Sequence, residues 1–139
     1  MTPSNPYDAK GMIKAAIRSD DPVIFYEHKR LYRLLKDEVP ADDYIVPIDK
    51  ANVVRTGSDL TVISYGMTLQ LALAAAEKLA AEGIDAEIVD VRSLYPLDRE
   101  TLVATAKKTG KVLLVTEDNK EGSVMSEIAA MKRSNKLTL

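Results

Sequence analysis

The segments Leu60-Thr-Val-Ile-Ser64 and Ala86-Glu-Ile-Val-Asp-Val91, with residues 67–82 between them, decide the fold of this chain. The two outer segments are rich in β-branched residues and predict strands. The segment between them predicts a helix that ends at Gly83, a residue suited to a left-handed C-cap. Its apolar side chains recur at helical spacing, at Leu69, Ala72, Leu73, Ala76 and Ala80. A strand, a helix and a second strand in this order predict a βαβ unit with parallel strands.

The same rhythm continues toward the C-terminus. Residues 98–109 predict a helix closed by Gly110, residues 111–116 predict a third strand, and residues 122–131 predict another helix. Because Val112 to Val115 form an unbroken apolar run, we expect this strand to be covered on both faces. The predicted fold is therefore α/β, with a small parallel sheet of three strands and no further strand after Met131.

The N-terminal residues predict an amphipathic helix. Asn5 suits the N-cap, Pro6 suits the first helical position, and Asp8 lies near the positive end of the helix dipole. One apolar face follows, made of Ala9, Met12, Ile13, Ala16 and Ile17. Pro22 ends this helix, and Val23–Tyr26 predicts a short strand.

The composition limits the class of protein. The chain has 139 residues, of which 46% are hydrophobic and 29% are charged, so we expect a globular protein. A net charge of −2 favours neither nucleic acid nor an anionic membrane as a partner. The absence of cysteine excludes a disulfide framework. With no apolar run long enough to span a bilayer and no secretory signal, we expect a soluble, cytoplasmic protein.

Several stretches, in this order and spacing, resemble one family. It is the beta subunit of the 2-oxoacid dehydrogenases, the thiamine-diphosphate-dependent decarboxylating component of the pyruvate, branched-chain and acetoin dehydrogenase complexes. The resemblance covers residues 3 to 131, and the forms of residues 30–33 and 117–123 are most similar to branched-chain-type bacterial members. The matching stretches are residues 5–17, 21–33, 46–48, 50–51, 61–66, 89–98 and 108–117.

The resemblance implies a domain organisation. Residues 1–33 would be the C-terminal tail of a pyrimidine-binding domain, and residues 51–139 an incomplete transketolase C-terminal-like domain. Residues 34–50, a polar stretch interrupted by Pro40, would be the linker. The chain would thus be a fragment of the subunit. Transketolase-type enzymes share the second domain, but the matches at residues 5–17 and 27–33 argue against them.

The resemblance also implies a function. The holoenzyme is an oxidoreductase, an α2β2 heterotetramer with an alpha subunit, which decarboxylates a 2-oxoacid and transfers the acyl group to lipoyl-lysine of an acyltransferase. Its thiamine diphosphate and magnesium depend on residues that precede residue 1 here. We therefore expect no catalytic or cofactor-binding residue in this chain, and no activity from it alone. Residues 132–139 depart from the family pattern, which puts binding of the acyltransferase in doubt.

The alternative is a non-catalytic assembly or interaction module that contributes only subunit contacts. An incomplete domain exposes apolar surface, so we expect the chain to self-associate.

One site implied by the resemblance falls within this chain. In relatives, the turn after the first helix holds potassium through backbone carbonyls, and the matching positions are Ala16, Ser19 and Asp21. A helix C-terminus leaves carbonyls without intrahelical partners, and a hard cation prefers oxygen ligands. The alternative is an ordinary turn whose carbonyls are hydrated.

Three polar positions at predicted strand ends have both a functional and a structural interpretation. His28 beside Glu27 could act as a general acid, but we prefer a histidine at a strand end or subunit interface. The turn Ser64–Thr68 could bind phosphate, but with one glycine it suits a tight strand–helix turn better. Asp90 and Arg92 could contact a ligand, but we prefer a local ion pair or an interface contact.

Two charged stretches are interpreted in the same way. Residues 29–33 are basic with one aromatic residue, and in an acidic chain we expect a subunit-contact segment rather than a nucleic-acid site. Glu117, Asp118 and Glu121 could hold a metal, but we prefer charges gathered near the N-terminus of the last helix.

Overall fold

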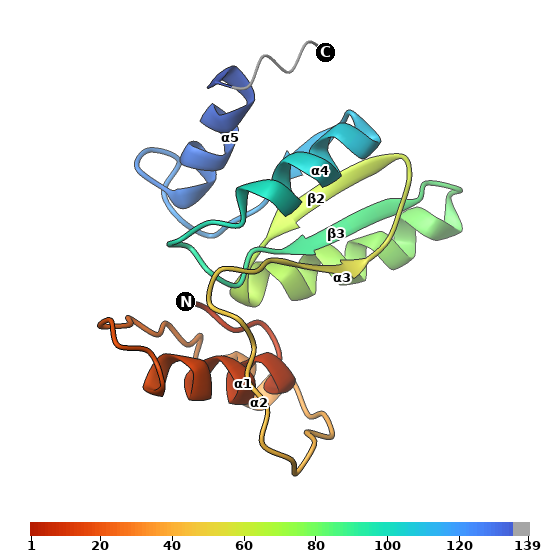
Figure 1. Cartoon of the computed structure of the whole chain (residues 1–139). Coiled ribbons are helices and arrows are strands. Elements are labelled where there is room, and N and C mark those ends of the chain that lie inside the picture. The colour runs from red at the N-terminus through yellow and green to blue at the C-terminus, as the bar shows by residue number, and fades with distance from the viewer. Residues whose placement is uncertain (135–139) are drawn as a thin grey trace.

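The computed structural model describes residues 1–134, with side chains described up to residue 131. Figure 1 shows α3 on one face of a sheet and α4 on the other, with α1 and α2 lying together on the side of the carboxyl ends of β2 and β3. The elements are α1 (Pro6–Ile17), α2 (Leu31–Leu34), β1 (Asn52–Arg55), β2 (Leu60–Ser64), α3 (Gly66–Ala81), β3 (Ala86–Asp90), α4 (Arg99–Thr109), β4 (Val112–Leu114) and α5 (Val124–Ser134).

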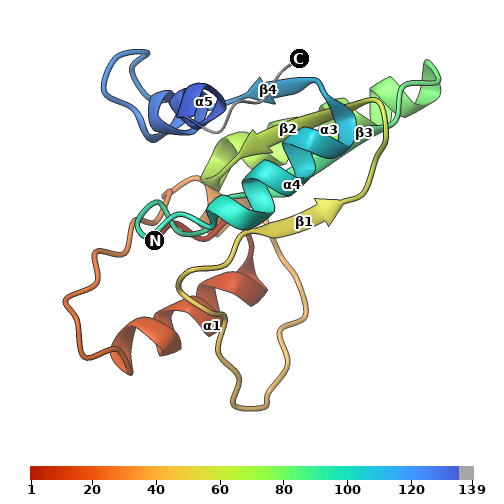
Figure 2. The same cartoon turned by 45° about the horizontal axis from the view of Figure 1, so that its top comes forward.

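The sheet has four strands in the order β1-β3-β2-β4 (Figure 2). β2 is parallel to both β3 and β4, which confirms the α/β class and the three predicted parallel strands. β1 pairs antiparallel with β3, so the sheet is mixed. β1 was not predicted, because its four residues give too short a pattern to separate them from the preceding polar stretch.

The predicted helix ends are confirmed by their caps. The Asn5 side chain accepts a hydrogen bond from the Asp8 backbone N–H at 2.8 Å, and the Asp98 side chain caps α4 through Thr101. Gly83 and Gly110 follow α3 and α4 with φ of +80° and +69°, as left-handed helix endings require. α5 ends three residues later than expected, and residues 135–139 of the predicted strandless tail lie outside the described part.

The core has one layer on each side of the sheet. α4 and α5 cover one face through Leu102, Met125 and Ile128, which pack on Ile63 and Val89. α3 covers the other face with small side chains, which let the helix approach the strands closely. These are Ala72 and Ala76, packed with Val62, Ala86 and Ile88.

Residues 1–50 form a smaller unit around α1, with Met1, Met12 and Val46 buried together. The expected linker is packed against this helix: the Val46 N–H donates to the Gly11 carbonyl at 3.1 Å. The Tyr44 ring stacks on Tyr7 with ring centres 4.5 Å apart. The linker therefore runs back along α1 rather than leading directly to the sheet.

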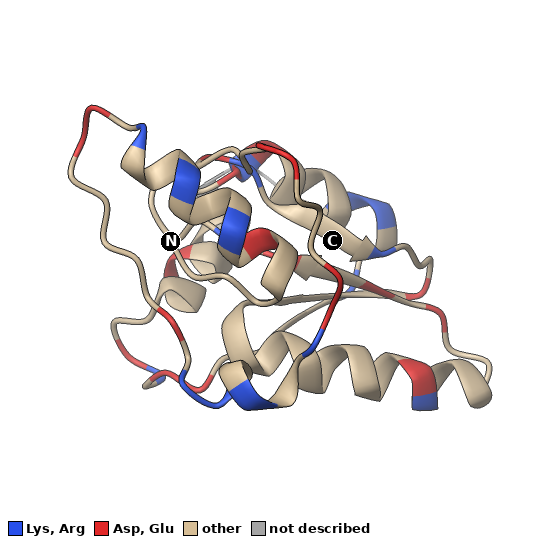
Figure 3. Cartoon of the chain, turned by 90° about the horizontal axis from the view of Figure 1, so that it is seen from below, with Lys and Arg blue, Asp and Glu red and all other residues tan. Residues whose placement is uncertain are grey.

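Charges are distributed over the whole molecule. Figure 3 shows basic and acidic residues on neighbouring segments of this view, in agreement with a net charge near zero. Asp43 of the linker illustrates this mixing, because it accepts from Lys14 of α1 and from Arg18, the residue that caps the end of this helix. These bonds hold the pKa of the exposed Asp43 carboxyl down, to about 2.

Two strand predictions were wrong in part. Residues 23–26 are extended but form no strand, because within the described chain their backbone bonds are to Met1: its ammonium donates to the Ile24 carbonyl, and the Tyr26 N–H donates to its carbonyl. β4 is not covered on both faces, since Val112 is 43% exposed and Leu113 53%. The cause is position: β4 is the outer strand of the sheet.

Candidate functional site

The carboxyl ends of β2 and β3 are the edge at which sheets of this kind usually bind ligands. Here that edge is filled by the chain's own N-terminal residues. The Thr2 N–H donates to the Arg92 carbonyl at 2.8 Å, and the Gln70 side chain donates to the Ser4 carbonyl at 2.7 Å. We call this region, formed by residues 2–8 with Ser64–Gln70 and Asp90–Arg92, the polar seam.

A buried ion pair lies at the centre of the polar seam. The Arg92 guanidinium donates two hydrogen bonds to Asp8, from Nε to Oδ2 at 3.0 Å and from Nη2 to Oδ1 at 2.6 Å. The Asp8 side chain is fully buried and also accepts from Asn5 at 2.7 Å. A two-pronged pair of this kind fixes orientation as well as charge. It joins α1 to the loop after β3.

Asp90 lies beside this pair and has fewer partners. Its Oδ1 accepts from the Arg92 backbone N–H at 3.2 Å, while its buried Oδ2 has no hydrogen-bond partner among the described residues. Burial raises the pKa of the Asp90 carboxyl to about 7, and the Asp8 charge raises it further. The Ser4 hydroxyl and the Arg92 backbone N–H act in the opposite direction. The Arg92 guanidinium bonds to Asp8 and not to Asp90, so the effect of burial on Asp90 prevails and its carboxyl holds a proton to a higher pH than an ordinary aspartate.

The turn Ser64–Thr68 is a strand–helix turn, as preferred from the sequence. The first N–H of α3, that of Gly66, donates to the Ser4 hydroxyl at 2.8 Å. The Ser64 hydroxyl donates to Thr68 at 2.9 Å. An incoming phosphate would therefore meet Ser4 at this helix N-terminus. The polar seam positions segments of the chain against one another.

His28 lies at an interface between the two units of the chain. Its Nδ1 accepts from the Arg30 N–H at 3.3 Å, and its Nε2 lies 3.4 Å from Glu117 Oε1. It lines a cavity of about 310 Å³ between α1 and α2, together with Glu27 and Tyr32. A hydrogen bond with Glu27 is the main cause that raises the pKa of Tyr32. This contact lies within the chain, and a subunit interface at His28 stays a prediction.

Of the acidic residues expected near the N-terminus of the last helix, Glu117 and Asp118 contact other segments. α5 begins at Val124, and its first-turn acid is Glu127. Glu117 instead faces His28, and Asp118 accepts a hydrogen bond from the Tyr65 hydroxyl. Burial, followed by the Asp118 bond, raises the pKa of Tyr65 to about 12. Within residues 1–131, no group of three or more His, Cys, Asp or Glu side chains is placed to hold a metal ion.

The turn with the predicted potassium ligands closes α1. The Ala16 carbonyl accepts from the Ser19 N–H at 3.3 Å, and the Asp21 N–H donates to the Ser19 hydroxyl at 3.2 Å. Asp21 is exposed and Ser19 is half-buried. The basic segment 29–33 overlaps α2 and is largely exposed. Its role in subunit contact stays a prediction.

Sequence reasoning missed the main features of the polar seam. Asp8 suggested only a favourable helix-dipole charge, and Ser4 gave no signal at all. Their partners, Arg92 and Gly66, lie 84 and 62 residues away along the chain. A short hydrophilic motif carries no information on partners at such separations. In the described part, no helix is long and apolar enough to cross a membrane.

The sequence and the fold of the chain are similar to those of known proteins. The profile of the family described as "Transketolase, C-terminal domain" matches residues 49–138, and the chain belongs to that family. It is 64% identical over 129 residues to the 2-oxoisovalerate dehydrogenase subunit beta of Bacillus subtilis strain 168. It is 45% identical over 128 residues to the pyruvate dehydrogenase E1 component subunit beta of Staphylococcus epidermidis strain RP62A.

These matches cover 93% and 92% of this chain but only 39% of either relative. The chain thus spans about two-fifths of the length of the curated relatives it matches. Among solved structures, a split gene transketolase described as an inactive beta4 tetramer superposes with a TM-score of 0.79 and 29% identity. That match covers 97% of this chain and 44% of the other.

Proposed function

We propose that this chain is part of the beta subunit of a branched-chain 2-oxoacid dehydrogenase. The observation that carries the proposal is the identity of 64% with a 2-oxoisovalerate dehydrogenase beta subunit, against 45% with a pyruvate dehydrogenase beta subunit, over nearly the same residues. The whole enzyme would decarboxylate a branched-chain 2-oxoacid oxidatively and transfer the acyl group to lipoyl-lysine of an acyltransferase.

Within that enzyme, the contribution of this chain would be structural. Residues 1–33 would belong to the pyrimidine-binding domain, residues 34–50 to the linker and residues 51–139 to the transketolase C-terminal domain. The filled strand edge supports this role, because the polar seam joins the first and third of these segments through Asp8 and Arg92. The alternative is a non-catalytic module that contributes only subunit contacts. It predicts the same structure for the chain, but under it no active enzyme would contain the chain.

Thiamine diphosphate and magnesium would belong to the holoenzyme. The helix N-terminus at the strand edge does not suit a diphosphate, since the Gly66 N–H is already bonded to Ser4. The proposal therefore places the contacts with this cofactor outside the chain, and the chain alone would be inactive.

Potassium is proposed at the backbone carbonyls of Ala16, Ser19 and Asp21. A carbonyl oxygen has two lone pairs, so the Ala16 carbonyl can accept from Ser19 and still bind a cation. Potassium chloride should then raise the midpoint of thermal unfolding above that in sodium chloride at equal ionic strength. Equal midpoints in the two salts would count against this site.

The proposed partners are an alpha subunit in an α2β2 assembly and the lipoyl-bearing acyltransferase. The split gene transketolase with a similar fold is described as a beta4 tetramer. This description supports the proposal that the chain carries an assembly surface. A cytoplasmic location, expected from the charge and composition, forms part of the same proposal.

The test is assembly followed by activity. The purified chain is mixed with the alpha subunit of a branched-chain dehydrogenase and, as a matched control, with that of a pyruvate dehydrogenase, and native mass spectrometry reads out complexes. We expect a complex with the first and weaker binding to the second, and no decarboxylation of 2-oxoisovalerate by the chain alone. Failure of the chain to bind either alpha subunit would contradict the proposal. Decarboxylation by the chain alone would contradict its structural role.

A further inference from the structure

The Asp90 carboxyl is enclosed by the described residues. Its side chain is fully buried, and Oδ2 has no hydrogen-bond partner among them. The guanidinium of Arg92, two residues away, is directed at Asp8 and holds it through two hydrogen bonds. A buried carboxylate without a cation of its own is unfavourable, so the closed polar seam favours the protonated form of Asp90.

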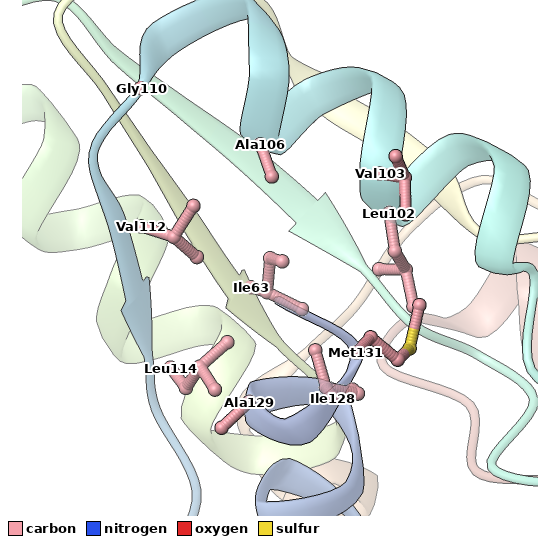
Figure 4. A pocket seen from close by; sticks show the side chains of 10 residues that line it. All are labelled: Ile63, Leu102, Val103, Ala106, Gly110, Val112, Leu114, Ile128, Ala129 and Met131. Carbon is pink, nitrogen blue, oxygen red and sulfur yellow. The ribbon is translucent and has the colours of Figure 1, made fainter. Parts of the chain in front are cut away.

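Two charged groups face Asp90. Asp8, from α1, favours the protonated form, and Arg92, from the loop after β3, favours the ionised form. The residues paired with Asp90 on the flanking strands, Asn52 and Ser64, carry no charge, and the first turn of α3 contains no acidic or basic residue. Figure 4 shows the groove on the other face of the sheet, between α4 and α5, and none of the ten residues that line it is titratable. Protonation of Asp90 is therefore governed within the polar seam.

Residues 2–8 cover Asp90 and are fastened to the loop after β3 at both of their ends. The Thr2 N–H donates to the Arg92 carbonyl at 2.8 Å, and Asp8 accepts from the Arg92 guanidinium at 2.6 Å. Arg92 has a φ of +57°, a conformation that L side chains rarely adopt. Such a conformation persists where the surrounding contacts hold it. Both fastenings of residues 2–8 thus depend on one strained residue beside Asp90.

We propose that the polar seam is a pH-sensitive joint, in which loss of the Asp90 proton releases residues 2–8 from the carboxyl ends of β2 and β3. The ionised carboxyl is repelled by Asp8 and is hydrated when the joint opens, so its charge favours the open form. The hydrogen bond with Ser4 acts against release. The joint uses only residues of this chain. It goes beyond the proposed enzyme function, and its failure would leave that proposal intact.

Linkage gives the direction and the size of the effect. The ordinary pKa of an aspartate is 3.8, and burial raises the pKa of Asp90 to about 7 in the closed joint. Below about pH 4 both forms hold the proton, so opening does not depend on pH. As the pH rises toward 7, only the open form releases the proton and its share increases. Above about pH 7 both forms are ionised, and the increase ends.

Amide hydrogen exchange, followed by NMR, measures this opening residue by residue. The reporters are the N–H groups of Thr2 and Gly66, which donate to Arg92 and Ser4. Each exchange rate is divided by the rate of an unstructured peptide at the same pH. We expect this ratio to rise about a hundredfold between pH 5 and pH 8. It should level off at the pH where the Cγ resonance of Asp90 titrates.

A substitution separates Asp90 from other titrating groups. Asp90→Asn cannot ionise, so the exchange ratio of Thr2 and Gly66 should stay constant from pH 5 to pH 8. Asp20→Asn removes an exposed carboxyl and is the matched control, which should behave as the wild type. Circular dichroism establishes that each variant is folded. If Asp90→Asn does not fold, the wild-type Cγ titration decides, and an exchange ratio that levels off at a different pH overturns the proposal.

Local opening is distinguished from unfolding by urea. Opening of the joint exposes little surface, so dilute urea should leave the exchange of Thr2 and Gly66 almost unchanged. The Val115 N–H, which donates to Ile63 within the sheet, is the reference and should exchange more slowly. Seam amides that exchange as slowly as Val115, with the same dependence on urea, would mean unfolding of the whole chain and would overturn the joint. A wild-type ratio independent of pH overturns it, and so does a pH dependence that survives in Asp90→Asn.

Discussion

Replacing Asp90 by Asn should remove a large pH dependence from the stability of the chain. Asp90 is fully buried, its Oδ2 has no partner in the described part, and burial raises its pKa from 3.8 to about 7. The folded chain therefore holds a proton on Asp90 that the unfolded chain releases above about pH 4. Such a proton makes folding less favourable as pH rises through this window, after which the loss is constant.

The magnitude follows from the width of the window. A difference of about three pKa units, at about 1.4 kcal/mol for each unit, corresponds to about 4 kcal/mol of unfolding free energy. The amide introduced by Asp90→Asn cannot titrate. The stability of this variant relative to the wild type should therefore increase by about that amount between pH 4 and pH 8. The difference in unfolding free energy between variant and wild type at pH 4 reflects other effects of the amide. The quantity to compare with the prediction is therefore how this difference changes between pH 4 and pH 8.

Urea denaturation followed by circular dichroism, at closely spaced pH values, measures this difference. Asp98→Asn is a control of opposite sign: burial alone would raise the pKa of Asp98, but hydrogen bonds from Thr101 and Ala51 outweigh it and hold the pKa below its ordinary value. The stability that Asp98 contributes is present above about pH 4 and is lost below it. A constant difference between Asp90→Asn and wild type from pH 4 to 8 would refute the reasoning, because Asp90 would then be ionised in the folded chain.

Four further substitutions test the packing. Arg92→Ala should lower the unfolding free energy by about 3–5 kcal/mol, because it leaves the Asp8 carboxylate buried without its cation; a loss below 1 kcal/mol in urea denaturation would show that water replaces the guanidinium. Gly57→Ala should prevent or severely weaken folding, since a Cβ at this position would lie 2.3 Å from the Ala86 carbonyl carbon. Gly83→Ala meets open space and should lower the unfolding free energy by about 1 kcal/mol because of its left-handed φ. Similar midpoints of thermal unfolding for the two variants would be inconsistent with the structure. Leu102→Ala should cost about 2–5 kcal/mol in the same assay, and a loss typical of an exposed leucine would mean that the core between α4 and the sheet is not packed as described.

The sequence was sufficient for elements whose signals are local. Asn5 and Gly110 marked helix ends because capping acts over three or four residues, and both caps are present. β2 and β3 were predicted because their β-branched runs are bounded by clear helix and turn signals. The predicted strand at residues 23–26 failed for the opposite reason, since a strand also needs a partner ladder, and the sequence does not say whether one is present.

Features that depend on distant residues were beyond the reach of pattern alone. The exposure of β4 follows from its place at the edge of the sheet, which its apolar run does not reveal. The Asp8–Arg92 pair and the Ser4 contact with α3 link segments that no motif connects. Arg92 was correctly suspected of an ion pair, but the partner was sought at Asp90 and found at Asp8.

The Asp8–Arg92 pair also bears on how the chain is made. During synthesis from the N-terminus, Asp8 is released 84 residues before the arginine that neutralises it. The unit of residues 1–50 has only four buried hydrophobic residues of its own, so a nascent chain that ends before Arg92 holds α1 only weakly. A ribosome that stalls before Arg92 would expose a segment open to proteases and chaperones. The last step in securing α1 is thus the translation of the loop after β3.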